Sequence, residues 1–224
     1  MTRFAIMAAL VGLATTVTAQ TAPTAREVAA YKGLFRAAHL GDVLAIRSLI
    51  ADGADVNARD SKNRTPIHVA AFASEDDALS ALAEAGADMN ALEGRAYDVV
   101  TIAAVADDPE LMSLAIELGN SPGLTTSPYD GTALIAAAHL GHVEVVRRLI
   151  DAGAPLNHIN NLHWTAVMEA IVLGDGGPNH QAVLDALLDA GADRTLADRE
   201  GISPLRHAEM RGFTEMVERL RSEN

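Results

Sequence analysis

Two short stretches decide the fold: Lys62-Asn63-Arg64-Thr65-Pro66-Ile67-His68-Val69-Ala70-Ala71, and after it Ala85-Gly86-Ala87-Asp88-Met89-Asn90. Thr65 can cap a helix by accepting a backbone N–H, and Pro66 suits the first helical position, where its missing donor costs nothing. Gly86 can end a second helix in the left-handed conformation that other residues resist. The two stretches therefore predict the start and the end of a pair of helices.

The same frame recurs along most of the chain. Glycines that close an apolar helical pattern follow one another at spacings of 33, 33, 34 and 38 residues; they are Gly53, Gly86, Gly119, Gly153 and Gly191. A period near 33 predicts a solenoid of stacked helical units, because no single unit can bury its own apolar face.

The recurring motif resembles the ankyrin repeat, whose hallmarks are a Thr-Pro-Leu-His-x-Ala start and an Ala-Gly-Ala-Asp-x-Asn end. The frame returns at Thr132-Ala133-Leu134, Thr165-Ala166-Val167 and Ser203-Pro204-Leu205. This resemblance implies an all-α solenoid of about six helix-turn-helix repeats joined by hairpin-like loops. It also implies that the function is protein binding and that the chain is not an enzyme.

Repeat boundaries follow from the motif. After a signal peptide at 1–19 and a linker at 20–28, we expect a capping repeat at 29–60, repeats at 61–93, 94–129, 130–160 and 161–198, and a second capping repeat at 199–224. The third repeat diverges, because Asp98-Val99-Val100-Thr101 replaces the usual start, although Asp98 can still cap a helix.

The turns between paired helices carry a second signal. Glycine stands four residues after the repeat alanine at Gly41, Gly141, Gly174 and Gly212. Ser74 and Asp107 replace it in two repeats, where we expect less favourable turns. The fifth repeat also has five extra residues around 174–180, which we expect in the loop between its helices.

The N-terminus indicates export. A basic start, an apolar run from Phe4 to about Val17 and small residues up to Ala19 are typical of a secretory signal peptide cleaved after Ala19. The pattern also resembles small exported ankyrin proteins of Gram-negative bacteria, on the strings at 96–103, 130–137 and 174–178. We therefore expect a periplasmic protein that is free of the membrane after cleavage.

Composition narrows the partner classes. The whole chain carries 17 Lys and Arg against 30 Asp and Glu; removal of residues 1–19 takes one arginine and leaves 16 − 30 = −14. Phosphate backbones repel such a surface, so nucleic acid is not an expected partner. The chain has no cysteine and so tolerates an oxidising compartment. We expect a monomer that binds a folded protein.

Candidate binding residues come from the family resemblance, which implies that the residues after the paired alanines and before each capping residue face a concave groove. The candidates are Arg64, Phe72, Tyr97, His139, Leu140, Trp164, Val172, Leu173 and Ile202. Trp164, the one tryptophan, is the leading anchor, because aromatic residues dominate binding hot spots. Packing under neighbouring loops is the competing interpretation for these side chains.

Two other functions stay open at this point. A metal-dependent protein could use His158, His163 or His180, although the helix from 165 to 173 separates the loop end from the insert by ~13 Å. Two local ligands without a third do not make a zinc site, so we expect no cofactor and no catalytic residue. An inhibitor or immunity protein that blocks a single enzyme would use the same groove as an adaptor.

Overall fold

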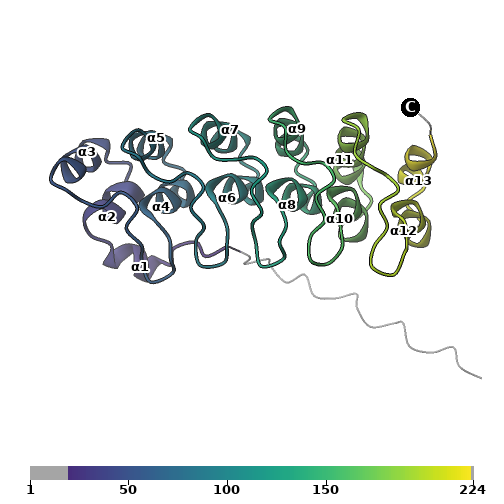
Figure 1. Ribbon diagram of the computed structural model, residues 1–224, viewed down its shortest axis with the longest axis horizontal. Coiled ribbons are helices and arrows are strands. Elements are labelled where there is room, and N and C mark those ends of the chain that lie inside the picture. The colour runs from purple at the N-terminus through teal and green to yellow at the C-terminus, as the bar shows by residue number, and fades with distance from the viewer. Residues whose placement is uncertain (1–19, 223–224) are drawn as a thin grey trace, which may run out of the picture.

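The computed structural model describes residues 20–222, which form a row of helix pairs (Figure 1). The first helices of the pairs are α2 (Gly33–His39), α4 (Pro66–Ala73), α6 (Val99–Ala106), α8 (Ala133–Leu140), α10 (Ala166–Val172) and α12 (Pro204–Arg211). The second helices are α3 (Val43–Ala51), α5 (Asp76–Glu84), α7 (Pro109–Glu117), α9 (Val143–Asp151), α11 (Pro178–Asp189) and α13 (Thr214–Arg221). Each kind of helix forms its own row, which confirms the expected all-α solenoid.

Short side chains let neighbouring pairs approach closely. The first helices carry the repeat alanines, such as Ala70, Ala103 and Ala137, and all three are fully buried. Larger side chains from the second helices, among them Leu82 and Leu149, fill the rest of one continuous core. The core therefore runs the length of the row, as the burial argument for stacked units requires.

Capping side chains begin most of the first helices. Thr132, Thr165 and Ser203 each accept a hydrogen bond from the backbone N–H three residues later. Asp98 does the same for Thr101 N at 2.8 Å, so the divergent third repeat starts its helix as expected. Lys32, which precedes α2, gives no such bond.

The turns after the first helices adopt the left-handed conformation at five of the six expected positions, and Gly174 of the fifth repeat is the exception. Ser74 has φ 54° and Asp107 has φ 55°, close to the φ of 74° at Gly141. The fifth repeat differs from expectation, since only part of its insert is loop. Pro178 starts α11 there, and the extra residues lengthen that helix to 12 residues.

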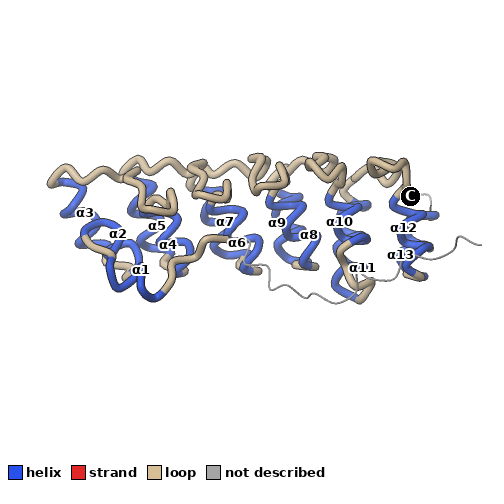
Figure 2. Tube along the Cα trace, turned by 90° about the horizontal axis from the view of Figure 1, so that it is seen from below, coloured by secondary structure: helices blue, strands red, loops and turns tan. Residues whose placement is uncertain are grey.

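Long loops connect the pairs and stand side by side along one edge of the molecule (Figure 2). At each loop tip one side chain closes a tight turn by accepting two backbone N–H groups; for example, Oδ1 of Asn160 accepts from Leu162 and Trp164, both at 3.0 Å. The equivalent acceptors in the other loops are Asp60, Glu93, Ser127 and Asp198. These acceptors hold the residue before each helix cap in a fixed position.

The segment expected as a linker at 20–28 is folded against the repeats instead. The short helix α1 (Ala25–Ala30), which a capping box of Thr24 and Glu27 begins, starts within this segment and ends two residues beyond it. Residues 20–30, which we call the N-terminal arm, run under α4 and α6 (Figures 1 and 2). Gln20 at its start donates to the backbone oxygen of Thr101 at 3.2 Å. The expected signal peptide at 1–19 lies outside the described residues.

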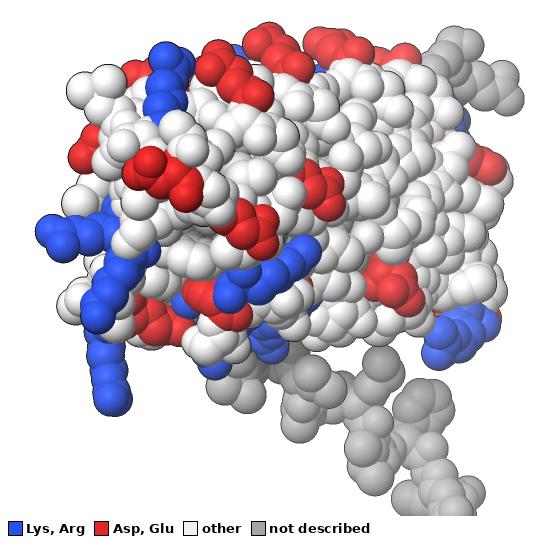
Figure 3. All heavy atoms as spheres, turned by 60° about the vertical axis from the view of Figure 1, so that its left-hand side comes forward, with Lys and Arg blue, Asp and Glu red and all other residues white. Residues whose placement is uncertain are grey.

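Charge is distributed unevenly over the surface. Acidic side chains gather along the upper edge of the molecule in Figure 3, over the row of second helices. Lysine and arginine side chains gather near the N-terminal end in the same view. None of the helices within residues 20–222 is both long and apolar enough to cross a bilayer.

Candidate binding site in the groove

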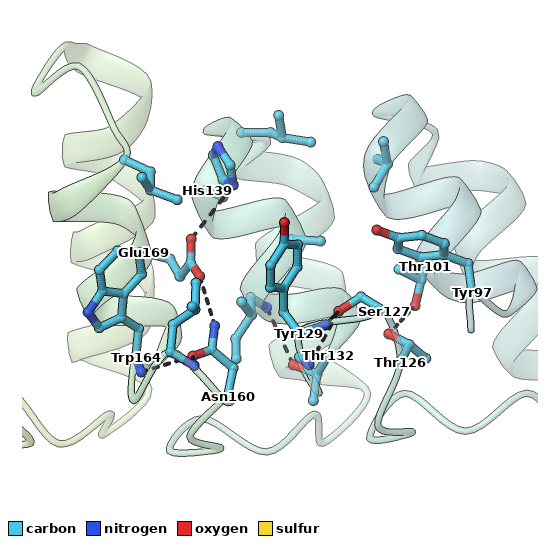
Figure 4. A pocket seen from close by; sticks show the side chains of 17 residues that line it. Tyr97, Thr101, Thr126, Ser127, Tyr129, Thr132, His139, Asn160, Trp164 and Glu169 are labelled. Atoms are coloured by element: carbon cyan, nitrogen blue, oxygen red, sulfur yellow. Dashed lines mark hydrogen bonds and ion pairs between the residues drawn. The ribbon is translucent and has the colours of Figure 1, made fainter. Parts of the chain in front are cut away.

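A pocket of about 400 Å³ opens between the first helices and the loop tips of the third, fourth and fifth repeats (Figure 4). Its walls are mainly apolar and include Ile135 and Leu140 from α8 and Leu173 at the end of α10. The rings of Tyr129 and Trp164 come from two successive loops. We call this cavity the groove pocket.

The groove pocket brings together five of the nine candidate residues. These are Tyr97, His139, Leu140, Trp164 and Leu173. Although they lie up to 76 positions apart in the sequence (173 − 97), stacking of the repeats places them around one cavity. Leu173 stays 43% exposed and Trp164 is partly buried, so both can contact a bound molecule.

The remaining four candidates lie elsewhere. Phe72, Val172 and Ile202 are partly buried and do not line the groove pocket. Phe72 and Val172 are near the ends of first helices, and Ile202 precedes the cap of α12.

Arg64 is not available to a partner, which corrects its assignment as a groove contact. Its side chain is 1% exposed, because the N-terminal arm covers it. The guanidinium bonds to Asp60 at 2.7 Å, to Glu27 of the arm at 2.9 Å and to the backbone oxygen of Thr21 at 2.8 Å. The arm therefore uses the position that the resemblance had given to a partner.

Glu169, which was not among the candidate residues, also lines the groove pocket and is 4% exposed. Oε1 accepts a hydrogen bond from Asn160 Nδ2 at 2.9 Å. Oε2 lies 3.6 Å from His139 Nδ1, too far for a hydrogen bond, and has no hydrogen-bond partner in the described part of the chain. The pocket thus combines apolar walls with one buried acceptor.

Burial determines the protonation of both groups. It raises the pKa of Glu169 to about 7, against which the Asn160 hydrogen bond acts. Burial, with a smaller effect from the charge of His180, lowers the pKa of His139. The imidazole is therefore mostly neutral near pH 7 and does not neutralise the carboxylate.

A sequence signal for Glu169 existed. Four residues after the cap, the equivalent positions in the three preceding repeats are Val69, Ile102 and Ala136, all apolar. The two terminal repeats have Arg36 and His207 there, so Glu169 is the one charged or polar residue at this position among the four internal repeats. A carboxylate in such a place is costly unless something compensates it. Tyr129, which is 55% exposed, was also not among the candidates, and no comparable signal marked it.

The histidines considered for metal binding are dispersed. His158 Nε2 bonds to the backbone oxygen of Asp130, whereas His180 bonds to Asp175 Oδ1 at 2.8 Å and to the backbone oxygen of His139 at 2.9 Å. Across residues 20–222, no group of three or more His, Asp or Glu side chains is arranged to hold a metal ion.

The fold and the groove pocket define a class, the helical repeat scaffolds that bind other molecules along a continuous surface. Family models described as "Ankyrin repeats (3 copies)" and "Ankyrin repeats (many copies)" match residues 100–198 and 34–76. The putative ankyrin repeat protein YahD of Escherichia coli (strain K12) is 34% identical over 186 residues, 82% of this chain and 92% of that protein. The chain belongs to the ankyrin repeat family.

Solved structures agree with this assignment. An ankyrin repeat domain from Acinetobacter baumannii AYE superposes with a TM-score of 0.78 at 41% identity, covering 84% of this chain and 95% of that one. The ankyrin repeat protein EF0377 gives a TM-score of 0.79 at 26% identity, with 87% and 100% covered. Ankyrin repeats generally mediate protein–protein interactions and are typically not catalytic.

Proposed function

We propose that the protein is a non-catalytic adaptor that binds a folded protein partner in the groove pocket. The observation that carries this proposal is the partly exposed apolar wall formed by Leu140, Trp164 and Leu173 around a cavity of about 400 Å³. Exposed apolar surface that is gathered in one place marks interaction sites, and a tryptophan in its wall suits an anchor.

The N-terminal arm supports this location of the site. It lies against the first helices of the second and third repeats and ends at Thr101, on one side of the groove pocket, so the lining of the pocket in the fourth and fifth repeats stays open. A partner that enters from solvent therefore meets Trp164 and Tyr129 without displacing any part of residues 20–222. The proposed site is smaller than the whole groove that the family resemblance implies.

Site-specific photo-crosslinking tests the proposal. We place a photoreactive amino acid at Leu173 in the pocket wall or at Arg147, which is exposed on the second helix α9. In cells that express the protein at its normal level, we expect one discrete crosslinked species from position 173 and none from position 147. Trp164→Ala in the same chain should reduce that species at least fivefold and leave the helical circular-dichroism signal unchanged.

Two results would contradict the adaptor proposal. One is a discrete species from position 147 with none from position 173, which would move the interface to the second helices. The other is an unchanged yield with Trp164→Ala, which would remove the groove pocket from the interface.

We further propose that the protein acts in the periplasm after its signal peptide is cleaved between Ala19 and Gln20. The basic start and the apolar run of residues 1–19 support this location. The expected result is a periplasmic fraction whose intact mass corresponds to a chain starting at Gln20. A full-length mass in the cytoplasmic fraction would contradict export and leave the adaptor proposal standing.

A further inference from the structure

One acceptor in the groove pocket lacks a donor. Glu169 is 4% exposed, and while its Oε1 accepts from Asn160, its Oε2 accepts from no group among residues 20–222. Buried polar atoms in folded proteins almost always have a partner, because losing water without replacement is costly. An orphaned oxygen that lines a ligand-sized cavity indicates a donor that arrives from outside.

The walls around this oxygen suit a donor on an apolar stem. Ile135, Leu140 and Leu173 supply aliphatic surface, and Trp164 and Tyr129 supply ring faces (Figure 4). Aromatic rings attract cations through the negative charge of their faces. The cavity thus offers contacts to a hydrocarbon chain and to a positive charge at its end.

Within the lining of the groove pocket, Glu169 is the one side chain that can form an ion pair with a positively charged group. Among the 17 residues that line the pocket, Glu169 is the one carboxylate, and His139 of α8 is the one basic side chain. His180 of α11 is turned to the backbone oxygen of His139. On α12, Arg211 bonds to backbone oxygens at the end of α10, and His207 bonds to a loop carboxylate.

We infer that the groove pocket binds a lysine side chain of the protein partner, with the ammonium group donating to Oε2 of Glu169 and the aliphatic stem lying against Leu140, Leu173 and Trp164. This inference rests on the adaptor proposal and specifies the chemistry of the partner. The net charge of −13 favours a basic partner over a longer range.

Lysine fits better than arginine because only one carboxylate oxygen is free. A guanidinium forms its most favourable pair with two oxygens of one carboxylate, whereas an ammonium is a compact point charge that needs one. Asn160 already donates to Oε1 at 2.9 Å, so a two-pronged guanidinium would have to share that oxygen with the amide.

Protonation of Glu169 couples this binding to pH. Burial raises the pKa of the free carboxyl to about 7, and a bound cation lowers it, so binding releases a proton when the pH lies below 7. Affinity for a cation should therefore rise about tenfold per pH unit up to about pH 7 and then level off. A neutral ligand should not show this rise.

Small lysine mimics test the inference directly. Trp164 is the one tryptophan of the chain and stands in the pocket wall, so its fluorescence reports occupancy. We titrate n-butylamine, the matched neutral 1-butanol and n-propylguanidine, which mimics arginine, at pH 8. Butylamine should bind at least tenfold more tightly than butanol and more tightly than propylguanidine.

The variant Glu169→Gln keeps the shape and the oxygen that faces Asn160 but removes the charge. It should reduce butylamine affinity about tenfold or more at pH 8 and leave butanol unaffected. Glu117→Gln, which removes a carboxylate exposed on α7, is the matched control and should change the affinity for neither ligand.

Thermal stability gives a test that needs no ligand. Glu169→Gln should raise the melting temperature of the protein at pH 8 and leave it unchanged at pH 5.

Several results would overturn the inference. Equal affinities for butylamine and butanol, or an unchanged butylamine affinity in Glu169→Gln, would show that the pocket binds only the apolar part of a ligand and that Glu169 does not pair with its ammonium group. A preference for propylguanidine would exclude lysine as the occupant. These outcomes do not affect crosslinking from position 173, so failure of the adaptor proposal is recognised separately.

Discussion

Equivalent positions in different repeats can have opposite roles. Arg64 and Trp164 both stand immediately before a capping threonine, and a loop acceptor closes the turn before each of them. Arg64 is buried by the N-terminal arm, whereas Trp164 borders an open cavity. What covers a position in three dimensions therefore decides whether the residue is structural or available for binding.

His68 shows how a repeat motif ties loops to helices. Its Nδ1 accepts from Thr65 N at 3.1 Å, which requires the proton on Nε2, and Nε2 lies 3.0 Å from the backbone oxygen of Ala91 and 3.2 Å from that of Tyr97. Burial lowers the pKa of His68 to about 4. The folded protein thus holds this imidazole in its neutral form.

This burial predicts sensitivity to acid. Because the folded-state pKa lies below the unfolded value of about 6.5, the contribution of neutral His68 is fully present above pH 6.5 and is lost as the pH falls towards 4. We expect the difference in unfolding free energy between wild type and His68→Gln to shrink by about 3 kcal/mol over that window. Urea denaturation at pH 7, 5.5 and 4 measures it, and parallel curves for the two proteins would exclude the effect.

At the scale of the element, a left-handed turn ends the first helix in five of the six pairs. Glycine provides this turn in three repeats, and Ser74 and Asp107 provide it in two. A residue with a Cβ is less stable in this conformation than glycine, which makes these two turns the weaker ones.

Ser74→Gly should therefore stabilise the protein by about 0.5–1 kcal/mol, since the strain removed exceeds the entropy that glycine adds to the unfolded chain. The midpoint of urea denaturation checks this. Ser74→Ala is the matched control, because it keeps the Cβ and should give no gain. A midpoint that Ser74→Gly lowers would show that the serine side chain stabilises the turn.

The sequence predicts the helices themselves, but it predicts only some of the contacts between segments that are distant in the chain. Period, caps and glycines near Thr65 and Gly86 identify helix ends because these are local constraints on the backbone. The docking of the N-terminal arm was not predictable, since Gln20 bonds to a residue 81 positions away. Glu169 was a visible anomaly in its helix, but only the stacked repeats show that its second oxygen lacks a donor.

On the scale of the whole molecule, the N-terminal arm is a further packed layer on the first half of the repeat row. Glu27 connects it to the core through Arg64 at 2.9 Å and closes the capping box of α1 with Thr24. The hydrogen bond to the Thr24 backbone, with the charge of Arg64, lowers the pKa of Glu27 to about 2. The Glu27 carboxylate therefore keeps its charge, and with it the ion pair to Arg64, throughout the neutral range.

Glu27→Ala should release the arm. Trypsin should then cleave after Arg26 at least several-fold faster, because the backbone of α1 is no longer held. Glu110→Ala is the matched control, since it removes an exposed ion pair with Arg148 on the second helices and should not alter cleavage at Arg26. Equal rates in all three proteins would show that Glu27 is dispensable for docking.

The docked arm also determines which residues of the scaffold can be substituted independently of others. The Arg64 side chain of the second repeat is committed to a segment of its own chain, so a substitution of Arg64 requires a compensating change between residues 20 and 30. In the third repeat the arm is held by the backbone oxygen of Thr101. The fourth and fifth repeats have no such obligation and can be diversified one position at a time. Libraries that aim to retarget this scaffold should accordingly keep its first hundred residues constant and randomise the far half.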